Sequence, residues 1–174
     1  SVDLFIPDKD TLYIHGVLGE ERNAHSNEWE ANAIDVTFAR IDNQLSSSFS
    51  FTLDSQSGDV HLRSSQEIDS FVARSKGKRI FLDITCLAHQ VWAQIVRSFI
   101  RKKSDIKVVY VEPSGYRFSV RPTEGDIFDL SEKISGISPL PGFTVLDDTE
   151  GDNVCFVPLL GFEGPRFAYM LEQV

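Results

Sequence analysis

Residues 79–85 read RIFLDIT and residues 107–111 read KVVYV, and these two runs, with the segment between them, decide the fold. Such apolar runs are typical of strands that are buried on both faces of a sheet. A strand, a helix and a strand within about 35 residues predict a βαβ unit, whose crossover is almost always right-handed. The intervening segment has apolar residues at helical spacing, namely Ala88, Val91, Trp92, Ile95, Val96 and Phe99.

Two strands and a helix are expected before this unit. Residues 11–18, TLYIHGVL, are rich in β-forming residues, and residues 35–41, DVTFARI, alternate apolar and polar side chains. Between them, Asn27 is placed to cap a short helix around residues 27–34. Glu30, three positions after Asn27, completes a capping box.

A hairpin and a second helix are expected next. Residues 49–53 and 60–62 flank the polar stretch DSQSGD, which predicts a hairpin whose loop is longer than the tightest types. Ser64 and Glu67 offer another capping box at the start of a helix. Gly77 is placed to end that helix in a left-handed conformation.

The rest of the chain is less regular. Residues 114–142 are interrupted by Pro and Gly and are interpreted as a surface excursion, either a lid or a partner contact. Residues 154–160, VCFVPLL, predict another strand, and Pro165 suits the first position of a final helix. Because that helix meets Val174 without a stop signal, we expect further domains to follow in the natural protein.

These patterns together predict one α/β domain over residues 1–174. We expect a Rossmann-like, open and mainly parallel sheet, with helices on both faces and one inserted hairpin. A chain of 174 residues is long enough to bury a full hydrophobic core as a single domain.

Composition limits the kinds of partner. The formal net charge of -9 argues against long duplex DNA or RNA, because phosphate binding needs a basic stripe. The dipole of one predicted helix explains the cluster of Arg97, Arg101, Lys102 and Lys103 at its end. No apolar run approaches the roughly 20 residues of a membrane span. With neither a secretory signal nor a disulfide framework in the pattern, we expect a cytoplasmic protein that does not bind membranes.

Polar residues follow three of the predicted strands, and ligands bind at this position in open α/β sheets. After the first strand, residues 19–26 read GEERNAHS. Glu20, Arg22, His25 and Ser26 are candidate contacts to a ribose or a phosphate. The alternative is a solvated loop in which the two glutamates pair with the arginine.

The second junction follows the strand at residues 79–85. Asp83 is expected to be buried, so it either holds backbone amides of the neighbouring loops or accepts a hydrogen bond from a ligand hydroxyl. Thr85 is placed to cap the next helix. Cys86 and His89 could form a nucleophile and a base on one helical face, although their spacing equally suits a helix that packs on the sheet.

The third junction, residues 161–166, reads GFEGPR. Gly161 and Gly164 would let a helix N-terminus approach an anionic ligand, with Glu163 beside them and Arg166 as a clamp. The alternative is a tight turn in which the arginine pairs with the glutamate.

Glu112, at the end of the strand that closes the βαβ unit, and Tyr116 nearby complete the expected pocket. We expect no metal and no resident cofactor. Cys86, His89 and His25 do not supply four zinc ligands at finger-like spacing. No catalytic constellation is complete, so the sequence favours a binding protein over an enzyme.

The run LDIT at residues 82–85, an amphipathic helix and the run VVYVEP at residues 108–113 together resemble the Rossmann-like sensor domains of the CARF type. Those domains commonly have a strand ending in Asp-x-Thr, a turn of small residues, a helix and a strand of the VxYV kind. The resemblance implies that Asp83 and Thr85 contact a ligand. Residues 86–88, CLA, stand where the family's turn is typically Gly-Gly followed by a polar residue.

Members of that family bind nucleotide second messengers, usually cyclic oligoadenylates, as dimers and control an attached effector in prokaryotic defence. The resemblance therefore implies a homodimeric sensor module for a nucleotide-like small molecule, coupled to an effector domain or a partner protein. Two alternatives remain open. One is a nucleotide or N-glycoside hydrolase that uses a loop carboxylate such as Glu20, Glu21 or Glu163. The other is a protein-interaction domain that uses residues 114–142 as its contact surface.

Overall fold

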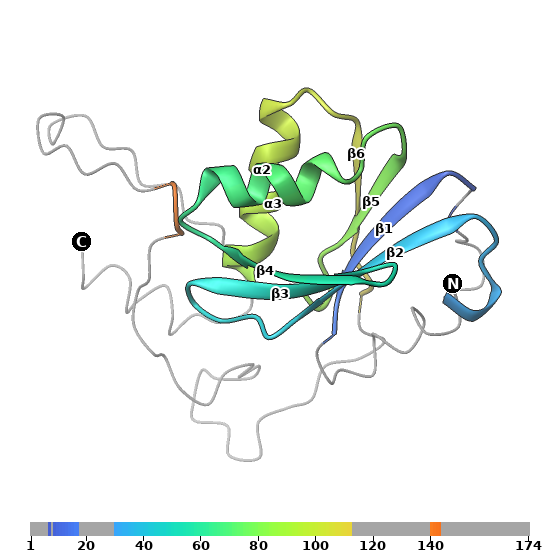
Figure 1. Cartoon of the computed structure of the whole chain (residues 1–174), viewed down its shortest axis with the longest axis horizontal. Coiled ribbons are helices and arrows are strands. Elements are labelled where there is room, and N and C mark those ends of the chain that lie inside the picture. Colours follow the sequence, from blue (N-terminus) through green and yellow to red (C-terminus); the bar gives the residue numbers. More distant parts are fainter. Residues whose placement is uncertain (1–6, 8, 18–29, 113–139, 144–174) are drawn as a thin grey trace, which may run out of the picture. The chain divides into compact units, whose positions relative to one another are not determined.

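The computed structural model describes residues 7, 9–17, 30–112 and 140–143. Its elements in chain order are β1 (Thr11–Gly16), β2 (Val36–Asp42), β3 (Ser48–Leu53), β4 (Gln56–His61), α2 (Ser65–Ala73), β5 (Arg79–Asp83), α3 (His89–Arg101) and β6 (Ile106–Val109). The strands form one mixed sheet in the order β4-β3-β2-β1-β5-β6 (Figure 1). Strand β1 is parallel to both of its neighbours, β2 and β5, and β5 is parallel to β6. Strands β3 and β4 extend the sheet beyond β2 by antiparallel pairing.

The βαβ unit expected around residues 79–111 is confirmed. Strand β5, helix α3 and strand β6 follow one another, and the two strands are parallel neighbours, with Leu82 opposite Val108. The predicted apolar stripe of α3 is buried at its centre, because Val91, Ile95 and Phe99 have no exposed surface. The class of the fold is therefore α/β, as the sequence predicts.

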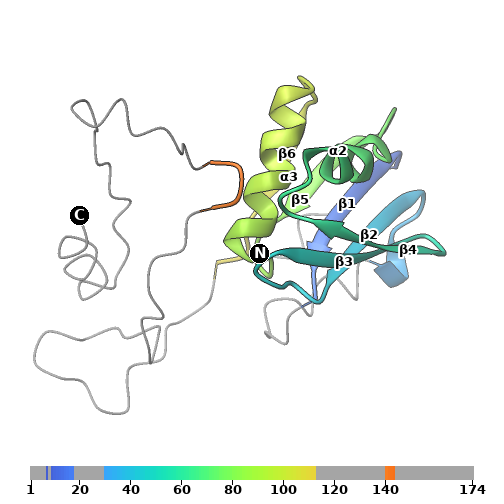
Figure 2. The ribbon, with the colours of Figure 1, turned by 60° about the vertical axis from the view of Figure 1, so that its left-hand side comes forward.

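Helices α2 and α3 cover the same face of the sheet (Figures 1 and 2). Successive side chains of a strand point to opposite faces, so Leu12 and Ile14 of β1 face these helices. Over the hairpin, the ring of Phe71 on α2 meets the rings of Phe49 and Phe51, with centroids 5.5 and 5.0 Å away. This face holds the main hydrophobic core.

Polar contacts join α2 to α3. The Asp69 carboxylate accepts hydrogen bonds from the Ser98 hydroxyl at 2.6 Å and from the Arg101 guanidinium at 2.5 Å. The Ser98 bond, with help from the Arg101 charge, lowers the pKa of Asp69 below its ordinary value. Lys102 donates to the backbone carbonyl of Asp69 at 2.9 Å. Two cations at the end of α3 therefore have partners on α2 in addition to the helix dipole.

The hairpin is confirmed, but the expectation of a long loop is wrong. Leu53 pairs directly with Gln56, so Asp54 and Ser55 alone make the turn, and Asp54 has a left-handed φ of 52°. The polar residues after the turn belong to β4 itself. Strand β4 lies at one end of the described sheet, and among its residues only Val60 is buried, so the strand carries little apolar alternation for sequence reasoning to detect.

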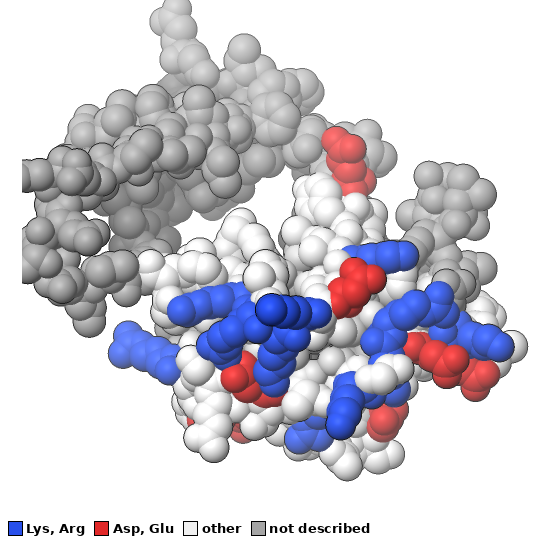
Figure 3. Space-filling view, turned by 90° about the horizontal axis from the view of Figure 1, so that it is seen from above, with Lys and Arg blue, Asp and Glu red and all other residues white. Residues whose placement is uncertain are grey.

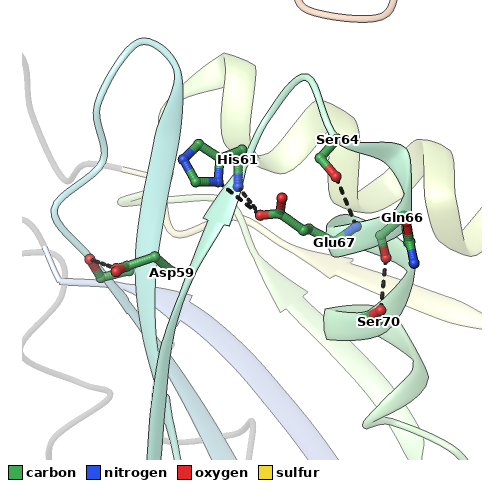
Figure 4. A network of polar contacts seen from close by, with 7 residues as sticks. Asp59, His61, Ser64, Gln66, Glu67 and Ser70 are labelled. Atoms are coloured by element: carbon green, nitrogen blue, oxygen red, sulfur yellow. Dashed lines mark hydrogen bonds and ion pairs between the residues drawn. The ribbon is translucent and has the colours of Figure 1, made fainter.

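Ser64 caps α2 as predicted, while the second half of the capping box differs. The Ser64 hydroxyl accepts from the Glu67 backbone N–H at 3.2 Å (Figure 4). The Glu67 carboxylate reaches past the cap residue and accepts from both the backbone N–H and the ring Nδ1 of His61, each at 2.9 Å. The bond from the His61 backbone is the main reason that the pKa of Glu67 is lowered. At the other end, α2 finishes at Ala73 with Arg74 as its C-cap residue, so the prediction that Gly77 ends the helix is wrong, although Gly77 has the expected left-handed φ, 83°.

The predicted capping of α3 by Thr85 is wrong. The N-cap residue is Ala88, whose side chain has no hydrogen-bonding group, and the backbone N–H of Ala88 donates instead to the side-chain oxygen of Gln44 at 2.7 Å. The amide nitrogen of Gln44 in turn donates to the Cys86 carbonyl at 2.8 Å. Thr85 lies too early to cap, and its hydroxyl accepts from the Val111 backbone N–H at 2.8 Å.

The end of β1 approaches the turn before α3 very closely, and Gly16→Ala tests this approach. A Cβ atom at Gly16 would lie 2.0 Å from the carbonyl oxygen of Cys86, so the backbone must shift to admit it. We expect the free energy of unfolding, measured in denaturant, to fall by at least about 1–3 kcal/mol, the usual cost of overpacking a core.

Gly58→Ala in β4 is the matched control, because a Cβ atom there would meet only ring atoms of Phe51, at 3.1 and 3.2 Å. The control should lose less stability than Gly16→Ala. An equal loss in the two variants would contradict the close backbone approach.

Candidate functional site

The order in which successive parallel strands are added to the sheet reverses between β1 and β5. Along the chain they run β1, β2, β5, β6, whereas across the sheet they run β2-β1-β5-β6. The chain therefore moves outward from β1 to β2 and then returns to the other side of β1. In open α/β sheets the crevice beyond the carboxyl ends of the two strands at such a switch is the usual ligand site.

The face of β1 that points away from α2 and α3 is polar and buried. Thr11 and Tyr13 have no exposed surface there, and His15 is 2% exposed. Strand pairing places Asp83, the last residue of β5, directly beside His15, and this carboxylate is 1% exposed. Buried polar and charged groups are costly unless they are hydrogen-bonded, so their partners define the site.

Asp83 is bonded through both carboxylate oxygens. Oδ2 accepts from the Tyr13 hydroxyl at 2.8 Å, and Oδ1 accepts from the Thr85 backbone N–H at 2.9 Å. Burial, and then the neighbouring Asp83 charge, raise the pKa of Tyr13 far above its ordinary value. The Tyr13 hydroxyl thus stays protonated and always donates. Of the two roles expected for Asp83, the anchoring of a neighbouring loop amide is the one that its observed contacts fill.

His15 is linked to a carboxylate that reaches toward the surface. Its Nε2 lies 3.2 Å from Oε1 of Glu30, whose side chain is 25% exposed. Burial lowers the pKa of His15 below its ordinary value, although the charge of Glu30 opposes this shift. A neutral imidazole that donates from Nε2 to Glu30 leaves Nδ1 as an acceptor. Among the described residues, this Nδ1 atom has no hydrogen-bond partner.

Two charged side chains continue the site onto β2. Arg40 pairs with His15 across the strands, so the two share a face, and its side chain is exposed. Asp42, two residues on, lies on the same face at the carboxyl end of β2 and is partly exposed. The site therefore combines a buried floor, made by His15 and Asp83, with three more accessible charged groups, which are Glu30, Arg40 and Asp42.

Three of the residues predicted as ligand contacts fall within the described part of the chain. Asp83 and Thr85 are brought together, and Glu112 is exposed next to Val111, whose backbone N–H bonds to Thr85. The other predicted contacts lie outside the described residues, and these are Glu20, Arg22, His25, Ser26, Gly161, Glu163, Gly164 and Arg166.

The idea of a Cys86 and His89 pair loses its structural basis. Cys86 is 3% exposed and lies in the turn before α3, whereas α3 begins at His89. The two residues therefore do not share a helical face, on which the nucleophile and base hypothesis depended.

Sequence reasoning missed Tyr13, His15, Glu30, Arg40 and Asp42 as members of the site. The signal was present in TLYIHG, where Thr, Tyr and His alternate with Leu, Ile and Gly. A period of two gives β1 one apolar and one polar face. Both faces are buried, and Tyr13 and His15 bond to Asp83 and Glu30 outside β1, whereas the buried Thr11 hydroxyl has no hydrogen-bond partner among the described residues.

Comparisons of the chain with protein-family models, with characterised proteins and with solved structures each gave no match. Within the described residues, no helix is both long and apolar enough to cross a membrane. In the same part of the chain, no three His, Cys, Asp or Glu side chains are grouped so that they could hold a metal ion. The geometry of the site is therefore what indicates its function.

The bond between Tyr13 and Asp83 can be tested by Tyr13→Phe. This change removes a hydrogen-bond donor to a buried carboxylate, and we expect the free energy of unfolding to fall by about 1–3 kcal/mol, the cost of an unsatisfied buried group. The matched control is Tyr110→Phe, since 57% of the Tyr110 side chain is exposed. Chemical denaturation measures the free energy of unfolding of both variants. Equal effects of the two substitutions would contradict a role for the Tyr13 hydroxyl in holding Asp83.

Proposed function

We propose that this domain binds a small nucleotide-like ligand at the carboxyl edge of β1, β2 and β5. The observation that carries the proposal is the burial of His15 and Asp83 side by side, on the two strands that flank the switch in strand order. Burying a histidine and a carboxylate at that point has a desolvation cost, which apolar residues in their place would not have. A binding site is a reason to retain them.

The charged groups around the buried floor fit the chemistry of a nucleotide. Carboxylates such as Glu30 and Asp42 accept hydrogen bonds from ribose hydroxyls, and an acidic residue at the end of the second strand has this task in dinucleotide-binding folds. The Arg40 guanidinium can pair with a phosphate group. His15 holds Glu30 through Nε2 and so acts as a positioning residue for that carboxylate.

The proposal extends to the finer properties that the CARF resemblance implies. The domain is then a Rossmann-like sensor, its ligand a cyclic oligoadenylate, and its working state a cytoplasmic homodimer coupled to a defence effector. The four neighbouring parallel strands support the Rossmann-like assignment. The contact of Glu30 with His15 supports it too, because residues 30–32 are helical and this contact lies on the face opposite α2 and α3.

Isothermal titration of the full chain with ATP, AMP and cyclic tetra- and hexa-adenylate tests the proposal. We expect Asp42→Asn to weaken binding of the preferred ligand at least about tenfold, because a charge-assisted hydrogen bond to a hydroxyl is lost. The matched control is Asp59→Asn on β4, which removes the same charge away from the parallel strands.

The identity of the preferred ligand decides between a cyclic-oligoadenylate sensor and a general nucleotide-binding domain. Preference for a cyclic oligoadenylate supports the sensor assignment, whereas preference for ATP or AMP restricts the proposal to a general nucleotide site. Chromatography of the ligand after incubation separates binding from cleavage. The proposal is wrong if none of these ligands binds, or if Asp42→Asn and Asp59→Asn weaken binding equally.

A further inference from the structure

A pocket lies at the edge of the sheet opposite the candidate site, where β5 and β6 begin. Its volume is about 380 Å³. It lies between the end of α2 and the starts of the two strands, so it is separate from the carboxyl edge that holds His15 and Asp83. Its lining residues are Ser75, Lys76, Gly77, Lys78, Arg79, Ile80, Phe81, Ser104, Asp105 and Lys107.

The lining of this pocket is strongly cationic in a chain that is acidic as a whole. Four basic side chains, those of Lys76, Lys78, Arg79 and Lys107, face a single acidic one, that of Asp105. The whole chain has a formal net charge of -9. Seen from above, Lys and Arg side chains predominate over Asp and Glu across the described part of this surface (Figure 3). The lining of the pocket is therefore cationic although the chain as a whole is acidic.

The helix dipole accounts for only part of this concentration. Lys76 follows the end of α2, where a cation complements the dipole. Arg79 and Lys107 belong to strands β5 and β6, for which no such explanation holds. The like charges repel one another, and Asp105 is the single acidic residue in the lining that offsets this repulsion.

The contacts of the three lysines leave their charge available. Lys78 donates to the Thr37 hydroxyl and Lys107 lies over the Phe81 ring, 5.4 Å from its centroid, and both of these partners are uncharged. Arg79 donates to the backbone carbonyl of Lys9 at 2.7 Å. In the part of the chain that the structure describes, Lys76, Lys78 and Lys107 form no ion pair.

The backbone at the pocket is also open to a ligand. Gly77 has a left-handed φ of 83°, and a Cβ atom built there would have no neighbour within 4 Å other than the adjacent residues Lys76 and Lys78. Because residue 77 has no side chain, a compact anion can approach the main chain between Lys76 and Lys78.

We propose that this pocket binds a small polyanion, a ligand with two or more linked phosphate groups. Three lysines line a volume of this size, and none of them forms an ion pair with a described residue. Together with Arg79 they match the charge density of a phosphate chain better than that of a single carboxylate. The site is independent of the proposed nucleotide site, because none of its lining residues belongs to that site.

Titration calorimetry with inorganic tripolyphosphate at constant ionic strength tests this proposal on the full chain. The double substitution Lys76→Gln and Lys107→Gln changes two exposed side chains, so the fold should persist. We expect it to weaken tripolyphosphate binding at least about tenfold, because two charge-assisted contacts are lost. Circular dichroism and a thermal melt of the variant verify that it is folded.

The matched control is the double substitution Arg63→Gln and Lys103→Gln. It removes the same total charge from two exposed residues that do not line the pocket, and it should weaken binding less than about twofold. His15→Gln should leave tripolyphosphate binding unchanged, which separates this site from the nucleotide site. The proposal is overturned if tripolyphosphate does not bind the natural sequence, or if the pocket and control variants lose affinity equally.

Discussion

A buried carboxylate at the end of β5 constrains the whole carboxyl edge of the sheet. Asp83 is held by the Tyr13 hydroxyl of β1 and by the Thr85 backbone N–H, while the Thr85 hydroxyl accepts from the backbone N–H of Val111. Strand β1, strand β5 and the segment after β6 are thus joined by one chain of hydrogen bonds. Removing a partner from a buried charge is strongly destabilising, so these bonds fix how the three segments meet.

The turn that follows Asp83 is packed with equal closeness. Gly16 meets the carbonyl of Cys86 with no room for a side chain, and the Gln44 amide bonds to the backbone on both sides of this turn. The turn beside the floor of the proposed nucleotide site is therefore tightly packed. A tightly packed site suits recognition, because its side chains then lose little conformational entropy when a ligand binds. Glu30, Arg40 and Asp42 at its rim have more freedom to adapt.

The parts of the fold that were predictable are those set by apolar periodicity. The β5–α3–β6 unit was visible because its strands are apolar runs and Val91, Ile95 and Phe99 repeat at helical spacing. The tight β3–β4 turn was not, because the polar residues of β4 resemble a loop. The roles of Thr85 and Gln44 depend on partners far away along the chain, Val111 and Cys86, which no local pattern reveals.

The candidate site, too, was predictable only in part. The position of Asp83 at the end of a buried strand was predictable from local sequence, and so were its two alternative roles. Its neighbours Tyr13 and His15 were not found, since β1 and β5 meet only through tertiary pairing. The alternation in TLYIHG contained this information, but its meaning depended on β1 lying in the interior of the sheet, with both faces buried.

The central claim is that His15 is a buried, neutral imidazole that donates from Nε2 on the polar face of β1. Its lowered pKa means that the unfolded chain takes up a proton more readily than the folded one. Its contribution to stability is therefore present above about pH 6.5, the ordinary histidine pKa, and is lost as the pH falls toward the folded value.

Nitrogen-detected NMR titration of the histidine side chains tests this claim most directly. The chain has four histidines, and the His15→Gln variant identifies the His15 signal by its loss. We predict a neutral ring with its proton on Nε2 at pH 7 and a midpoint below 6.5. A His15 ring that is doubly protonated at pH 7, or that titrates at or above the ordinary histidine value, would contradict the account.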